Sequence, residues 1–117
     1  MRVTELNEFQ ISLSLDDLAK KYDVKLSLAY KSLYISLLRF CVKMGRYDED
    51  KKRYFAELTV NEMINEFKAG HTTVANALKA LSECTAISRV KSASGAKNKS
   101  CVTYVNTDFL GNNEERG

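Results

Sequence analysis

The segment from Thr59 to Leu81 constrains the fold most strongly, because it encodes two short helices separated by one glycine. Its first four residues, Thr59 to Glu62, form a capping box, in which each of the two side chains accepts the other residue's backbone amide. Apolar residues then recur at helical spacing on both sides of Gly70, namely Val60, Met63, Ile64 and Phe67 before it and Val74, Ala77, Leu78 and Leu81 after it. We therefore predict a helix that ends at residues 68–70 and a second helix capped by Thr72 or Thr73.

The hydrophobic period changes on both sides of this helix pair. Tyr54–Leu58 is rich in aromatic residues and suits a strand. After Cys84 the pattern shifts toward alternation, which predicts strands at Ile87–Lys91 and Ser100–Val105 joined by a loop over residues 92–99. The order strand, helix, turn, helix, strand, loop, strand describes a winged helix-turn-helix, so the expected fold class is α+β and mostly helical.

Two further helices are expected before this unit. A Ser-x-x-Asp signal at Ser14 predicts a short helix over Leu15–Tyr22, and Ser27 is expected to cap a longer helix that runs to about Lys43 and stops at Gly45. The longer helix is apolar around most of its circumference, so it is either the central helix of the core or also packs on another subunit. The candidate dimer contacts on this helix are Tyr30, Tyr34 and Leu38.

The length of 117 residues suits one domain. We expect a single winged-helix domain over residues 1–110, made of a helical, dimerisation-type segment at 1–45 and the helix-turn-helix with its wing at 54–107. Residues 45–53 carry charges of both signs and are expected to form a solvated connector. Residues 111–117 are expected to be a flexible tail.

The composition argues against several classes of protein. No apolar run approaches the roughly 18 residues of a membrane span, and the N-terminus lacks the basic-then-apolar order of a signal peptide. Three widely spaced cysteines then predict reduced thiols in the cytoplasm, and together with one histidine they predict no metal site. Because no phosphate-binding loop and no catalytic constellation is recognised, we expect neither an enzyme nor a cofactor.

The net charge of +3 is small, but its distribution suggests a polyanionic partner. Between Cys84 and Thr107 the chain has four basic residues and no acidic one. In a winged helix the second helix enters the major groove of double-stranded DNA, where Asn76 can pair with adenine and Lys79 can contact guanine or phosphate. The candidate DNA-binding residues are His71, Thr72, Thr73, Asn76 and Lys79 on this helix and Arg89, Lys91, Lys97, Asn98 and Lys99 on the wing.

From about Phe9 to Asp108 the sequence resembles the N-terminal domain of RepA-type plasmid replication initiators of Gram-positive bacteria. The resemblance rests on residues 28–39, on Tyr47-Asp48-Glu49 with Arg53-Tyr54-Phe55, and on the wing outline Ala86–Lys91, Gly95-Ala96-Lys97 and Tyr104-Val105. It implies sequence-specific binding of repeated origin DNA as a homodimer whose N-terminal helices supply the dimer contact. Members carry a further C-terminal domain that recruits host replication proteins, so this sequence is expected to be either an excised domain or a stand-alone relative.

Two other functions stay open at this point. One is a phage- or plasmid-borne transcriptional regulator, because winged helices serve many regulatory roles. The other is a protein-binding adaptor or inhibitor of a host nucleic-acid enzyme, because Glu83 balances Lys79 on a weakly basic second helix. Affinity for duplex DNA as a function of salt separates the DNA-binding functions from the adaptor, since phosphate contacts weaken steeply with added salt.

Overall fold

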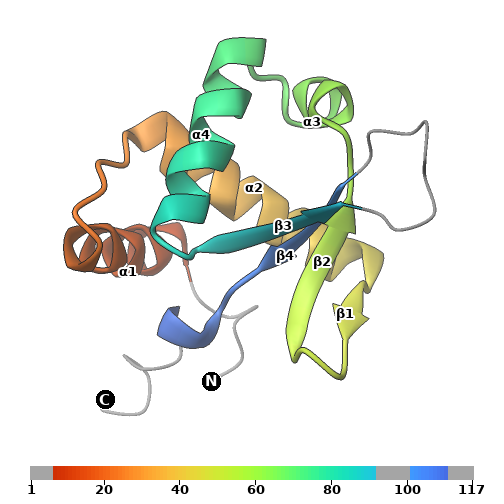
Figure 1. Ribbon diagram of the computed structural model, residues 1–117, viewed down its shortest axis with the longest axis horizontal. Helices are drawn as coiled ribbons and strands as arrows, with labels where there is room; N and C mark the ends of the chain where they lie inside the picture. Colours follow the sequence, from red (N-terminus) through yellow and green to blue (C-terminus); the bar gives the residue numbers. More distant parts are fainter. Residues whose placement is uncertain (1–6, 92–100, 111–117) are drawn as a thin grey trace.

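The computed structural model describes residues 7–91 and 101–110, which form helices packed on one antiparallel sheet (Figure 1). The elements follow in the order α1 (Glu8–Lys21), α2 (Leu28–Met44), β1 (Tyr47–Asp48), β2 (Arg53–Glu57), α3 (Val60–Phe67), α4 (His71–Glu83), β3 (Ile87–Lys91) and β4 (Cys101–Val105). A single helical turn over residues 108–110 follows β4.

The sheet has the strand order β1-β2-β4-β3, with antiparallel pairing throughout. The strand that precedes the helix pair, β2, therefore lies beside β4, the second strand of the hairpin, and β3 lies at the edge. This strand order, combined with the α3–α4 pair, matches a winged helix-turn-helix. The predicted fold class, α+β and mostly helical with two helices in front, is confirmed.

The first helix begins earlier than predicted. Asn7 caps α1, because its side-chain oxygen accepts the Gln10 amide at 2.8 Å while the Gln10 side chain accepts the Asn7 amide at 3.2 Å. Ser14 is an interior, buried residue of the helix, so the predicted start at Ser14 is wrong, whereas the predicted end at Tyr22 differs by one residue from the last helical residue, Lys21. The buried apolar face of the helix includes Ile11, one turn before Leu15. The Ser-x-x-Asp pattern at Ser14 led sequence analysis to start the helix after this residue.

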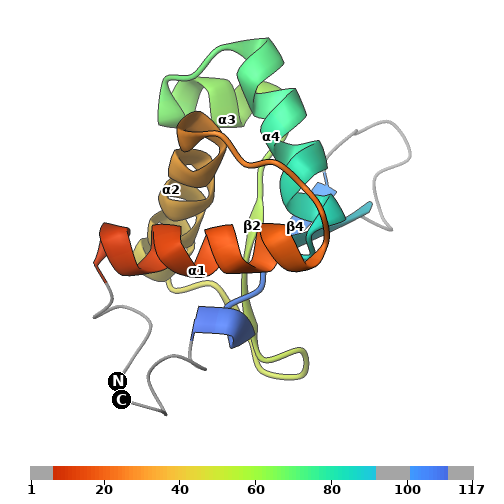
Figure 2. The same cartoon turned by 90° about the vertical axis from the view of Figure 1, so that its left-hand side faces the viewer.

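The second helix is the centre of the core. Ser27 caps α2 through the Tyr30 amide, and Gly45 ends it in the left-handed region at φ 67°, both as predicted. Figure 2 shows α1 crossing α2 on one side, and α2 also contacts α4, β2 and β4. Tyr34 and Leu38 are 0% and 3% exposed, so the prediction that they form dimer contacts is wrong, since their own domain covers them.

Asn106, directly after β4, joins this central helix to the corner between α4 and β3. The Tyr34 hydroxyl donates to the Asn106 carbonyl oxygen at 2.6 Å. The Asn106 backbone amide donates to the Ala86 carbonyl at 2.9 Å, and its side-chain amide donates to the Thr85 carbonyl at 3.1 Å. Burial raises the pKa of Tyr34 well above its usual value, so the phenol stays protonated and remains a donor.

The connector between α2 and β2 contains a strand that sequence analysis did not predict. Tyr47–Asp48 forms β1, and the Tyr47 ring meets the Tyr54 ring edge-on with centroids 5.0 Å apart. The Asp48 carboxylate accepts the amides of Asp50 and Lys51 at 2.9 and 3.1 Å and so closes the turn. The expectation of a purely solvated connector over residues 45–53 is therefore wrong at β1.

We predict that Tyr34→Phe lowers the free energy of unfolding by about 1–2 kcal/mol, because the Asn106 carbonyl loses its phenolic donor in a partly buried position. The matched control is Tyr30→Phe, since the Tyr30 side chain lies at the edge of the core and is half-buried. Urea denaturation followed by circular dichroism measures both variants. An equal loss in the two variants would show that the Tyr34 hydrogen bond contributes nothing specific.

We predict that the protein loses stability in alkaline solution through its buried thiols. Burial raises the pKa of Cys41 from 9.0 to about 12, and it also raises the pKa of Cys84. Above pH 9 the unfolded chain therefore releases the Cys41 proton while the folded chain keeps it, so the free energy of unfolding falls by up to about 1.4 kcal/mol per pH unit for this group.

Cys41→Ala tests this source of alkaline instability. We expect the variant to be less stable than the parent protein at pH 7, because a buried sulfur is removed, and the difference should shrink above pH 9. Urea denaturation with a reducing agent at pH 7, 8, 9 and 10 gives the comparison. A difference that stays constant with pH would contradict the raised pKa.

Candidate nucleic-acid interface

The second helix of the helix-turn-helix, α4, begins earlier than predicted from the sequence. Gly70 is the N-cap of α4, and no side chain caps the helix. Thr72 and Thr73 lie inside the first turn, so the prediction that one of them caps the helix is wrong. The backbone of Gly70 is extended, at φ −74° and ψ 157°, so a side chain fits at this position without strain.

The predicted core face of α4 is confirmed, whereas the predicted outer face is confirmed only in part, because Ala80, which was also expected on it, is buried. Val74, Ala77, Leu78 and Leu81 are buried. Of the predicted DNA-binding residues, His71, Thr72, Asn76 and Lys79 are exposed and Thr73 is half-buried. The outer face also includes Ala75 and Ser82, which sequence analysis left out although both share the helical stripe of Lys79 at i, i+4 and i+7.

The edge strand β3 brings a cation beside this stripe. Arg89 lies directly opposite Thr103 on β4, and its Nε donates to Thr103 Oγ1 at 3.1 Å. Thr103 is fully buried and Arg89 is half-buried, so the guanidinium is anchored to the interior of the sheet. Thr103 is a functional candidate that sequence analysis missed, although the alternation of the hairpin places it on the same sheet face as Arg89.

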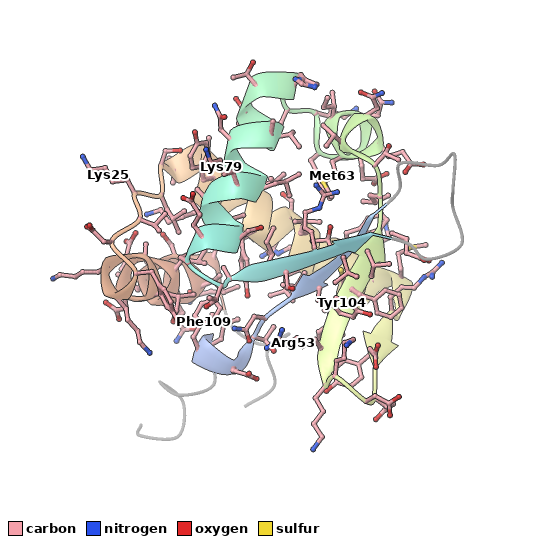
Figure 3. All side chains as sticks on the ribbon, viewed as in Figure 1. Lys25, Arg53, Met63, Lys79, Tyr104 and Phe109 are labelled. Atoms are coloured by element: carbon pink, nitrogen blue, oxygen red, sulfur yellow. The ribbon has the colours of Figure 1, made fainter. Side chains whose placement is uncertain are left out.

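A shallow hollow of about 330 Å³ lies between α4 and β3. Its lining residues are Val60 at the start of α3, Ala75, Leu78, Lys79 and Ser82 of α4, and Arg89 of β3. Two of these side chains, Lys79 and Arg89, are cationic, Ser82 carries a hydroxyl group, and none is acidic. Figure 3 shows Lys79 extending outward from α4, and the residue is exposed as well as part of the lining of the hollow.

The ion pairs that the structure describes lie away from this hollow. Lys31 pairs with Asp16 at 2.9 Å, Arg39 with Glu8 at 3.1 Å, and Arg46 with Glu57 at 3.4 Å. Within residues 7–91 and 101–110, neither Lys79 nor Arg89 pairs with a carboxylate. No described carboxylate therefore forms a direct ion pair with the two cations beside α4, although Glu83 lies one turn from Lys79 on the same helix.

The structure describes only some of the remaining residues that were predicted to bind DNA or to form a dimer contact. Lys91 ends β3, where it pairs with Cys101 along the backbone. Lys97, Asn98 and Lys99, like the loop predicted over residues 92–99, lie outside the described residues. Tyr30, the third candidate dimer contact, is half-buried against the core of its own domain.

A second cluster of rings and cations lies around Phe55 and Tyr104, whose centroids are 6.0 Å apart. Arg46 covers Phe55 but also pairs with Glu57, and the Tyr104 hydroxyl donates to Asp48 at 3.4 Å. Partial burial and the Asp48 carboxylate raise the pKa of Tyr104, and the Lys51 ammonium lies 5.4 Å from the centre of its ring. This cluster therefore contains carboxylates beside its cations, whereas the lining of the hollow contains none.

The described ranges contain neither a cluster of metal ligands nor a membrane-spanning helix. No group of three or more His, Cys, Asp or Glu side chains there is placed to hold a metal ion. None of the helices described is both long enough and apolar enough to cross a membrane.

We predict that Gly70→Ser stabilises the protein by about 0.5 kcal/mol. The new hydroxyl can cap α4 and the unfolded chain loses conformational freedom, while a Cβ at residue 70 meets nothing within 4 Å. The matched control is Gly45→Ser, which we expect to destabilise by about 1 kcal/mol because residue 45 has φ +67°. Thermal denaturation measures both, and a loss of stability in Gly70→Ser would contradict the N-cap geometry.

Comparison with known proteins supports the fold. No protein-family model matches the sequence, and no curated protein matches it either. Two solved structures are similar in three dimensions. One, described as the "N-Terminal domain of DNA binding protein", gives a TM-score of 0.56 at 16% identity over 79% of this chain and 72% of that chain. The other, described as the "Structure of Rep-DNA complex", gives a TM-score of 0.55 at 16% identity over 78% of this chain and 72% of that chain. At this level of identity the likeness establishes a shared fold.

Proposed function

We propose that this chain binds double-stranded DNA as the DNA-binding domain of a replication-initiator-type protein. In this proposal α4 enters the major groove, and the β3–β4 hairpin faces the neighbouring backbone and minor groove. The observation that carries the proposal is the outer face of α4, which presents small polar side chains beside two cations that form no direct ion pair with a described carboxylate.

The size and chemistry of the α4 side chains suit a base-reading surface. Asn76 is exposed on the outer face, and an asparagine amide can donate to and accept from the major-groove edge of adenine. His71 and Thr72 lie in the first turn, where the exposed amides of a helix N-terminus favour a phosphate. The small Ala75 beside Asn76 allows the helix to approach the bases closely.

The comparisons favour an initiator over the other DNA-binding roles. One similar structure is a Rep protein in complex with DNA, and the sequence itself resembles RepA-type initiators. Recognition of repeated origin DNA, a homodimeric state and contact with host replication proteins follow from that resemblance and stay predictions. The structure removes Tyr34 and Leu38 from any such dimer contact.

Binding measurements test the proposal. A preferred site is first selected from a pool of random duplexes, and its affinity is then measured by fluorescence anisotropy over a range of salt concentrations, beside a random duplex. We expect affinity for both duplexes to fall steeply with salt, because phosphate contacts release counterions. Absence of duplex binding above about 100 mM salt would contradict the proposal and favour a protein-binding adaptor.

We predict that Asn76→Ala costs about 1–3 kcal/mol of binding free energy on the selected site and much less on the random duplex. The matched control is Asn65→Ala, which removes an exposed asparagine from α3, outside the proposed recognition helix. Equal losses on the two duplexes would assign Asn76 to a phosphate contact.

Direct repeats of the selected site at a replication origin would support the initiator role, whereas a single site overlapping a promoter would support a regulator.

A further inference from the structure

The hollow between α4 and β3 occupies the place where the two DNA-facing elements meet. Residues of α4 form one wall and Arg89 of β3 forms the other. Figure 1 shows that β3 runs from the C-terminal end of α4 past the helix toward the start of α3. The hollow is therefore lined by residues of α3, α4 and β3.

Duplex geometry determines what would pass over this position. A recognition helix in the major groove and a hairpin at the adjacent minor groove are separated by one sugar–phosphate backbone, because each backbone forms the wall between the two grooves. In the docking proposed above, that backbone crosses the boundary between α4 and β3. The group that faces the hollow is then a phosphodiester with its deoxyriboses.

The lining of the hollow suits this group. The guanidinium of Arg89 can bind two phosphate oxygens at once, and its anchoring to Thr103 uses only one of its five N–H donors. Ser82 adds a hydroxyl donor and Lys79 adds a mobile second cation. Val60 and Leu78 offer an apolar surface for a sugar. Glu62, the acidic residue nearest in sequence to Val60, accepts the Thr59 amide at 2.8 Å and does not line the hollow.

We propose that this hollow is a phosphodiester clamp, in which Arg89 binds one backbone phosphate of the DNA and the buried Thr103 is the positioning residue that orients the guanidinium. The inference rests on the proposed function and deepens it. Lys79 then acts on the same phosphate and contributes to affinity for every sequence, so base reading is left to Asn76 and its neighbours.

Substitutions at Arg89 test the clamp on the selected and the random duplex. We expect Arg89→Ala to weaken binding equally on both and to reduce the slope of log affinity against log salt by about 1, because one phosphate contact is lost. Arg89→Lys keeps the charge, so the slope should stay while affinity falls about tenfold through loss of the two-oxygen contact. The control is Arg39→Ala, an exposed arginine of α2 that pairs with Glu8, for which we expect no change in DNA binding.

The positioning role of Thr103 has its own readout. Thr103→Val keeps the shape of the side chain and the charge of Arg89 but removes the acceptor of the Arg89 Nε bond. We expect affinity to fall several-fold in the parent protein. In the Arg89→Lys background Thr103→Val should have no further effect, because lysine has no equivalent donor to orient. A merely structural role for Thr103 would give the same loss of affinity in both backgrounds and would overturn the positioning role.

Neutral phosphates locate the contact on the DNA. The selected duplex is prepared with one methylphosphonate at a time, and each is titrated with the parent protein and with Arg89→Ala. We expect one position at which the neutral group weakens binding of the parent protein about tenfold and weakens binding of Arg89→Ala clearly less, because only Lys79 still acts on that phosphate in the variant. Equal responses of the two proteins at every position would overturn the clamp. If the parent protein binds with a steep salt dependence but Arg89→Ala matches it, only the clamp fails; if the parent protein binds no duplex, the proposed function fails with it.

Discussion

The hydrogen bonds that meet at Asn106 determine how α4 and β3 sit relative to the core. One comes from Tyr34 of the central helix, and two go to Thr85 and Ala86, the residues that join α4 to β3. Because Thr85 has φ 65°, the chain turns sharply there, and a turn of this kind depends on its surroundings for support. The buried, protonated phenol of Tyr34 thus connects the core of the domain to the corner from which both candidate DNA-contacting elements extend.

The placement of charge follows from this arrangement. The ion pairs described hold α1 to α2 and hold Arg46 to Glu57, where they neutralise the cations involved. Around Phe55 and Tyr104, cations lie beside carboxylates as well. At the junction of α4 and β3, in contrast, Arg89 is anchored by the neutral hydroxyl of Thr103 and keeps its full charge for an external partner. A net charge of +3 can therefore serve a polyanion because it is unevenly distributed.

The accuracy of the sequence-based predictions differed with the kind of interaction. The Thr59–Glu62 capping box, the Ser27 cap and the Gly45 stop were predicted correctly, because each depends on atoms a few residues apart. Ser14 and Thr72 also resemble caps, but Asn7 and Gly70 are the N-caps of α1 and α4. The Asn7–Gln10 capping box is a local signal that sequence analysis missed, whereas Gly70 caps α4 without any side-chain hydrogen bond. Strand β1 escaped detection because its stability comes from Tyr54 on another strand. The prediction of dimer contacts at Tyr34 and Leu38 failed for a related reason. A helix that is apolar all round shows the same sequence pattern whether its own domain or a second subunit covers it.

The sequence by itself determined the order of the elements apart from β1, the core face of α4 and the concentration of basic residues after Cys84, because periodicity and composition are local properties of the chain. It placed Asn76 and Lys79 on the exposed side of a helix without any tertiary information. Only the tertiary structure decided that Arg89 stands opposite Thr103 and shares a hollow with Lys79, Ser82 and Val60. Those contacts join residues far apart in the chain, and their geometry exists only once the sheet has paired and α2 has been buried beneath it.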